Sequence, residues 1–329
     1  MKSFGLGTYA LTVGVAVALL AGCSGSQPPI GAPGAIPQTS AIATHAHRGT
    51  SWMLREATGE TLLYASSDFG TVSVFGYPKG NLVGVLSGFD LADGECVDKA
   101  GNVFIADTGA SDVVEYAHGG TNPINTLTDP GHEPFSCAID AATGNLAVTN
   151  FDGGSVAIYS NGAGTPTIYS LPGVAVMFCG YDNDGNLFVD GRVTESHFAL
   201  YELPHGSGTP TNINTNLNIS PGPIQWDGKH LALGYGQNNN SVIYQISVSG
   251  SSATVVGSTS LNGPGKFDIL NGGEWWIYGD RVLVPYRKHG LKFDYIGFWR
   301  YPQGGRAFKK IHVIDKEKFL VGVTVSPAN

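Results

Sequence analysis

The sequence predicts an all-β fold built from short antiparallel sheets of four strands, repeated along residues 51–329. A sequence pattern recurs there at spacings of 41 and 42 residues, a period typical of solenoids and propellers. No segment carries a convincing 3.6-residue apolar period, and short apolar runs alternate with turns that contain Gly, Asn and Asp. We therefore expect strands rather than helices to build the core.

The repeat is clearest in three consecutive copies and weaker in two more. The clear copies are GECVDKAGNVFIAD (94–107), FSCAIDAATGNLAVTN (135–150) and MFCGYDNDGNLFVDG (177–191), and the weaker ones are PIQWDGKHLALG (223–234) and WWIYGDRVLVPY (275–286). The equivalent aspartates are expected to accept backbone N–H bonds in a turn between two strands, and they are Asp98, Asp140, Asp182 and Asp227.

Each copy resolves into four short strands, which in the second unit lie at about 94–98, 102–107, 112–117 and 123–128. Four-stranded sheets repeated radially bury both faces against their neighbours, as in a β-propeller. The second strand of each unit starts at a recurring apolar position, which gives six units: Leu62, Val103, Leu146, Leu187, Leu231 and Val282. Either residues 51–53 or residues 321–325 would supply the inner strand of the first unit, and the C-terminal segment fits the repeat better.

The run Cys-Val-Asp followed by Gly-Asn-Val-Phe-Ile-Ala-Asp-Thr-Gly resembles an NHL repeat. Residues 51–325 as a whole resemble the six-bladed propellers that include the gluconolactonase-like proteins. That resemblance implies a metal site of carboxylate, Asn and Asp at the axis. Glu95 suits the first role, but the equivalent positions hold Ser136, Phe178 and Gln225, so the set is not visible and no cofactor is expected.

The N-terminus predicts a secreted, lipid-anchored protein. Lys2 precedes the apolar run LTVGVAVALL at 11–20, which is shorter than a membrane span. Leu20-Ala21-Gly22-Cys23 then resembles the bacterial lipobox, so residues 1–22 are expected to be cleaved and Cys23 to be acylated. Residues 23–50 are rich in Ser, Pro, Gly and Ala and predict a flexible tether. Ser24 after the cysteine favours the outer membrane if the cell is Gram-negative.

Three further cysteines occupy equivalent places in adjacent units: Cys96, Cys137 and Cys179. The repeat explains their spacing, and cysteine packs well as a small buried hydrophobe, so packing is the favoured interpretation. A metal or redox role is the alternative. Three cysteines cannot all pair with each other, so no disulfide scaffold is expected. Four tryptophans are expected to pack between sheets, unless one of them floors a binding site: Trp226, Trp275, Trp276 and Trp299.

Charge is unevenly distributed along the chain, which totals −8. Residues 281–329 hold ten Lys or Arg against three Asp or Glu, hence +7, whereas residues 23–280 hold seven against 23, hence −16. Such a field steers partners and sets specificity. The loops on the usual ligand face of propellers therefore predict an acidic binding face with one cationic loop, formed by Glu95, Asp107, Asp190, Arg287, Lys288, His289 and Lys292.

These features predict a non-catalytic, monomeric binding module of the cell envelope, whose partner is a protein, a glycan or a small molecule. The alternatives are a metal-dependent lactonase- or lyase-like enzyme with its site at the axial mouth, and a structural envelope lipoprotein. No catalytic residue is assigned. The negative charge and the extracytoplasmic location disfavour nucleic acid as a partner.

Overall fold

The computed structural model describes residues 50–130, 133–194, 197–235, 241–262, 267–269, 273–288, 294–313 and 319–328. The predicted signal peptide, Cys23 and nearly all of the predicted tether lie outside these residues. Among the described residues, no helix has the length and hydropathy needed to cross a membrane. Strands dominate these residues, as the repeat predicts, and the helical structure in them consists of short 3-10 turns.

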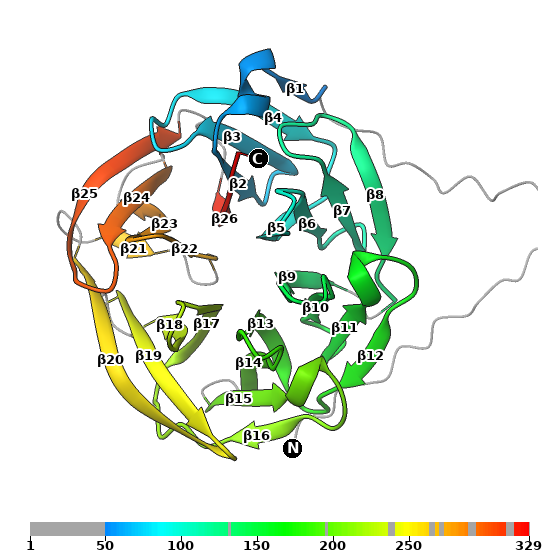
Figure 1. The fold of residues 1–329 in the computed structure, drawn as a ribbon, viewed down its shortest axis with the longest axis vertical. Coiled ribbons are helices and arrows are strands. Elements are labelled where there is room, and N and C mark those ends of the chain that lie inside the picture. The colour runs from blue at the N-terminus through cyan, green and yellow to red at the C-terminus, as the bar shows by residue number, and fades with distance from the viewer. Residues whose placement is uncertain are drawn as a thin grey trace, which may run out of the picture. The chain divides into compact units, whose positions relative to one another are not determined.

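Antiparallel sheets follow one another around a common centre (Figure 1). The first sheet has the order β1-β4-β3-β2-β26. Its elements are β1 (Trp52–Met53), η1 (Arg55–Gly59), β2 (Leu62–Ser67), β3 (Thr71–Gly76), β4 (Leu82–Ser87) and β26 (Leu320–Ser326). The second sheet, β5-β6-β7-β8, consists of β5 (Ala92–Val97), β6 (Val103–Asp107), β7 (Asp112–Tyr116) and β8 (Pro123–Thr128), close to the strands expected for that unit.

Two further sheets keep the same four-stranded order. One comprises β9 (Pro134–Ile139), β10 (Leu146–Asn150), β11 (Ser155–Tyr159), η2 (Ser160–Gly162) and β12 (Thr167–Ser170). The next comprises β13 (Ala175–Tyr181), β14 (Leu187–Thr194), β15 (His197–Leu203), η3 (Pro204–Gly206) and β16 (Thr211–Ile213).

The remaining strands form a sheet of nine in two antiparallel groups. The first group is β17 (Ser220–Trp226), β18 (Leu231–Tyr235), β19 (Ser241–Ser249) and β20 (Ser252–Asn262). The second is β21 (Phe267–Ile269), β22 (Trp276–Tyr278), β23 (Arg281–Lys288), β24 (Asp294–Arg300) and β25 (Gly304–Val313). Two parallel residue pairs join the groups, Leu261 with Gly305 and Asn262 with Arg306.

The C-terminal strand closes the ring, which confirms the preference for residues 321–325. β26 pairs antiparallel with β2, from Leu62 opposite Ser326 to Ser67 opposite Leu320. β1 instead pairs with β4 at the outer edge of the same sheet. One sheet therefore contains strands from both ends of the described chain, and this pairing ties the ring together.

The repeated aspartates act as predicted. The Oδ1 atom of Asp98 accepts the N–H groups of Ala100 and Asn102, each at 2.8 Å. The same oxygen of Asp182 accepts the N–H of Asp184 at 2.9 Å and that of Asn186 at 2.8 Å. These side chains hold the turn between the first two strands of a sheet, which accounts for their recurrence.

The repeated cysteines are buried, but they are not equivalent. Cys96 in β5 and Cys137 in β9 form a disulfide with their Cα atoms 5.6 Å apart, whereas Cys179 in β13 is a buried free thiol. The predicted packing role therefore holds for Cys179. For Cys96 and Cys137 it is incomplete, because these two residues covalently join neighbouring sheets. The sequence did not predict this bond, because the three cysteines occupy equivalent positions and no pair among them is favoured over another.

Candidate functional site

The innermost strands meet around the centre of the ring (Figure 1), where β26, β5, β9, β13 and β17 contact one another in turn. Each of β5, β9, β13 and β17 finishes at one of the aspartate turns. We call this end of the centre the turn end and the opposite end, where the inner strands begin, the loop end.

Glu274 is a buried carboxyl near the centre of the ring, and β26 fixes its backbone. Its N–H donates to the carbonyl of Val321 at 2.6 Å, and its carbonyl accepts the N–H of Val323 at 3.2 Å. The carboxylate accepts the N–H of Glu95 at 2.8 Å through Oε2 and the hydroxyl of Ser136 through Oε1. Burial raises the pKa of Glu274 to about 7, although both hydrogen bonds act in the opposite direction.

Glu95 lies in β5 beside Glu274 and is fully buried. Burial raises the pKa of Glu95 well above its usual value, and the nearby charge of Glu274 raises it further. The Ser66 hydroxyl and the backbone at Thr324 partly counter that rise. A low-dielectric site resists two adjacent negative charges, so both carboxyls favour the protonated form more than exposed ones do.

Two other predicted face residues are buried and bond to backbone groups. Asp190 in β14 accepts the N–H of Phe178 at 3.1 Å and that of Gly222 at 2.9 Å, and so joins the inner strands β13 and β17. Asp107 at the end of β6 accepts the N–H groups of Asp90 and Leu91 at 3.0 and 2.9 Å. Each carboxylate holds a connection in place rather than presenting an exposed charge.

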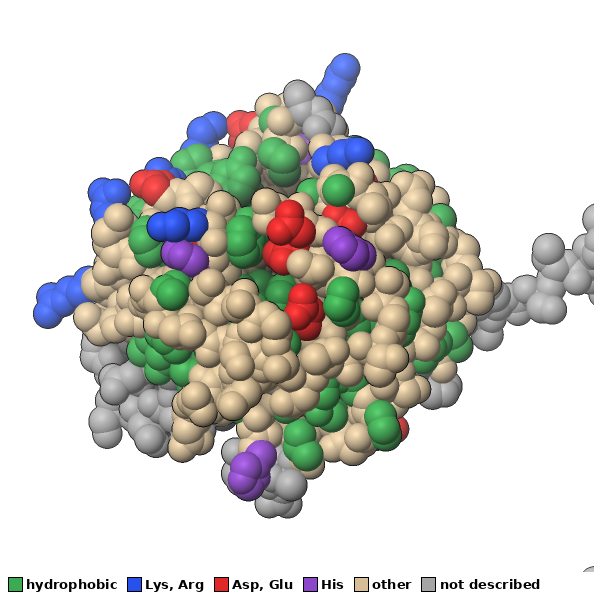
Figure 2. All heavy atoms as spheres, turned by 60° about the horizontal axis from the view of Figure 1, so that its bottom comes forward, with side chains coloured by type: hydrophobic (Ala, Val, Ile, Leu, Met, Phe, Trp, Pro, Cys, Tyr) green, Lys and Arg blue, Asp and Glu red, His purple; other side chains and the backbone are tan. Residues whose placement is uncertain are grey.

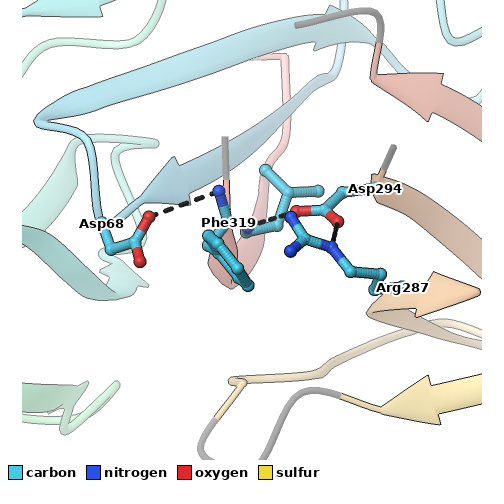
Figure 3. A network of polar contacts seen from close by, with 5 residues as sticks. Asp68, Arg287, Asp294 and Phe319 are labelled. Atoms are coloured by element: carbon cyan, nitrogen blue, oxygen red, sulfur yellow. Dashed lines mark hydrogen bonds and ion pairs between the residues drawn. The ribbon is translucent and has the colours of Figure 1, made fainter. Parts of the chain in front are cut away.

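The loop end carries a mixed polar and aromatic cluster (Figure 3). Arg287 and Asp294 form an ion pair at 2.6 Å, and the guanidinium carbon of Arg287 lies 3.5 Å from the ring centre of Phe319. On the other side of Phe319, Asp68 accepts that residue's N–H at 3.3 Å. Burial raises the pKa of Asp68, and Arg287 lowers it. The exposed ring of Phe69 stacks on Phe319 at 6.3 Å between centres.

Arg287 is thus near Asp68, but its guanidinium is already paired with Asp294. Lys288 ends β23, and its side chain, together with His289 and Lys292, lies outside the described residues. Figure 2 shows a face on which Lys and Arg lie mainly along one side while several Asp and Glu gather nearer the middle. The predicted bipolar binding face stays a prediction.

The turn end holds a cavity of about 310 Å³, which we call the axial pocket. The ends of β5, β9, β13 and β17 form most of its wall, with the segment that leads into β22. Its aromatic residues include Trp226 and Trp276, both partly exposed, and Trp275, which is buried. Glu274 and the Cys179 thiol also line it.

The sequence indicated the tryptophans as a possible floor of a site but missed Glu274. This residue precedes the degraded fifth copy of the repeat and has no equivalent acidic position in the clear copies. Its partners Glu95 and Ser136 are 179 and 138 residues away in sequence. The one sequence signal for Glu274 was its position directly before Trp275 and Trp276. That position indicates a buried site only once ring closure has brought Glu274 against Glu95 and Ser136.

Comparison with known proteins identifies the fold of the chain but does not place it in a family. Neither a family model nor a curated protein matches the chain. A solved structure titled "Crystal structure of Nidogen/Laminin Complex" matches with a TM-score of 0.62 and 13% identity, over 82% of this chain and 98% of that chain. The fold is a β-propeller. In all, 1029 chains of solved structures match, so structural likeness alone indicates no function, which must come from the chain's own residues.

The propeller's donor groups do not fit the three-ligand metal site that the gluconolactonase-like resemblance implies. In the described part of the chain, no three His, Cys, Asp or Glu side chains converge in a way that would hold a metal ion. Glu95 meets Glu274 and Ser66 in place of an Asn and an Asp. The arrangement is suited to holding hydrogen-bond donors or a positive charge near the axial pocket.

Proposed function

We propose that this chain is a lipid-anchored, extracytoplasmic six-bladed propeller that acts as a binding module for a small ligand held in the axial pocket. The pocket itself carries the proposal, because it combines about 310 Å³ of space, tryptophan walls and a buried carboxyl. Small-molecule sites are typically concave, mostly apolar and supplied with a few well-placed polar groups.

The proposed six-blade arrangement is supported by the pairing of the nine-stranded sheet, and the proposed NHL-like assignment rests on the sequence of the repeat. In the described part of the chain, the two antiparallel groups of that sheet are joined by two parallel residue pairs, between β20 and β25. They coincide with the two weaker copies of the repeat, at 223–234 and 275–286. Treating these groups as separate blades gives every copy of the repeat a blade of its own.

The proposed anchor rests on the order of features at the N-terminus, from Lys2 through the apolar run to Leu20-Ala21-Gly22-Cys23. In a bacterial host fed radiolabelled palmitate, the full chain should become labelled and sediment with the envelope fraction. Cys23→Ala should abolish labelling, because the thiol that receives the lipid is gone. Cys179→Ala serves as the matched control and should keep the label. Equal labelling of the Cys23 variant and the natural chain would contradict the anchor.

We expect the binding of a small ligand in the axial pocket to depend on the tryptophans that line it. Trp226 and Trp276 line it, so an occupant should change their fluorescence. We expect 2-phenylethanol to bind the full chain in detergent, and Trp276→Ala to weaken that binding about tenfold, which corresponds to about 1.4 kcal/mol. Fluorescence titration and calorimetry measure both constants, with glucose and maltotriose tested in parallel to detect a glycan preference.

Trp52→Ala is the control for this test, since Trp52 lies 42% exposed on the outer strand β1 and does not line the pocket. Its binding constant should match that of the natural chain. Absence of binding by all three probes at millimolar concentration would overturn the pocket as a small-ligand site.

A further inference from the structure

The axial pocket is lined by acidic and apolar groups, and this chemistry narrows its ligand class. We propose that it takes a small ligand with an aromatic or apolar body and a cationic amine, with the amine held by the carboxyl of Glu274. This inference rests on the proposed function, namely that the pocket binds a small ligand.

The charges of the lining carry the first step. Among the described residues that line the pocket, none is Lys, Arg or His, whereas Asp182 and Glu274 are both acidic. An anionic ligand would lose its hydration there without gaining a charged partner, which is costly. A cationic ligand would meet negative charge, so the lining selects for a cation or a neutral donor.

The place of Glu274 carries the second step. Its two oxygens accept one hydrogen bond each, from Glu95 and Ser136, and a carboxylate has about four acceptor positions in all. It lies close enough to the pocket thiol for its charge to raise the pKa of Cys179, after the larger effect of burial. In the described part of the chain, no basic side chain forms a salt bridge with Glu274. A buried carboxylate without a cation is unfavourable, so an ammonium group would supply the missing partner.

The aromatic walls carry the third step. Trp226 and Trp276 line the cavity and are partly exposed, and Tyr181 and Trp275 add two buried rings to the lining. Indole and phenol faces attract ammonium groups and also bury large areas of an apolar ligand. An aliphatic or aromatic amine combines charge pairing with the carboxyl and contact with the rings. A sugar brings no positive charge to the carboxyl, and a carboxylate ligand is repelled by it.

A matched series of three probes separates charge from shape: 2-phenylethylamine, 2-phenylethanol and 3-phenylpropanoate. Calorimetry on the full chain in detergent at pH 8 should give a dissociation constant at least about tenfold lower for the amine than for the alcohol, with the propanoate weakest. The amine's advantage should shrink at pH 5.5, because the carboxyl of Glu274, whose pKa lies at about 7, is then mostly protonated.

The variant Glu274→Gln keeps the size and one acceptor of the side chain but removes its charge. It should bring the amine and the alcohol to nearly equal affinity while leaving the alcohol within about twofold of the natural chain. Asp184→Asn is the control, because Asp184 is an exposed carboxylate outside the pocket lining, and it should retain the full amine preference.

Two results would overturn this inference in distinguishable ways. If the three probes bind with equal affinity, or the propanoate binds best, the amine assignment fails while the pocket remains a ligand site. If the amine preference survives in Glu274→Gln, the assignment of the anchoring carboxyl fails. Binding by none of the three probes would remove the pocket as a small-ligand site together with this inference.

Discussion

Replacing Cys96 and Cys137 together by alanine should lower the free energy of unfolding by about 4 kcal/mol. The disulfide closes a loop with a sequence separation of 41 residues, and such a cross-link reduces the conformational freedom of the unfolded chain by roughly that amount. It also joins β5 to β9, which lie in neighbouring blades. Urea denaturation of the full chain, followed by fluorescence, measures the change.

Cys179→Ala is the matched control, because Cys179 is the buried free thiol at the equivalent position of the next blade. It should cost about 1 kcal/mol, the typical effect of a single substitution. A reducing agent should shift the midpoint of the natural chain and of the Cys179 variant, but not that of the double variant. An unfolding midpoint of the natural chain that does not respond to reduction would contradict a stabilising disulfide.

Glu274→Gln should make the stability of the protein less sensitive to pH. Burial raises the pKa of Glu274 from 4.5 to about 7, so between these values the folded chain holds a proton that the unfolded chain has released. The contribution of Glu274 to the free energy of unfolding is therefore fully present below about pH 4.5 and is lost as the pH rises through about 7. For an isolated group this amounts to about 3 kcal/mol, and the glutamine variant should lack that loss.

The measurement is the free energy of unfolding at several pH values between 4.5 and 8, for the natural chain and the variant. Glu56→Gln is the control, since Glu56 is an exposed carboxyl in η1 and its removal should leave the profile unchanged. A residual slope of the same sign should remain in Glu274→Gln, because burial also raises the pKa of Glu95 and brings that of Asp93 to about 6. Parallel profiles for the natural chain and Glu274→Gln would contradict the assignment.

The raised pKa of Glu274 and its proposed role in holding an amine together predict that ligand binding is linked to proton release. A cationic ligand favours the ionised carboxylate, so its binding near neutral pH should release a proton from the folded chain. The same charge that destabilises the empty fold at alkaline pH would then stabilise the complex, since a ligand that binds only the folded state raises stability.

The sequence by itself determined the repeat, the turns and the closing strand. These features are encoded locally: Asp98 and Asp182 bond to N–H groups at most four residues away, and alternation of apolar strands with turns sets the units. Even closure by β26 could be predicted, because residues 321–325 carry the pattern of an inner strand.

Only the tertiary structure decided the chemistry at the centre. Closing the ring brings Glu274 against Glu95, buries both, and thereby raises both pKa values. It also joins Cys96 to Cys137 and leaves Cys179 free, a choice on which three equivalent positions give no information. Burial and proximity depend on residues far apart in the chain, so an acidic residue in the sequence indicates a charge but not the environment that sets its behaviour.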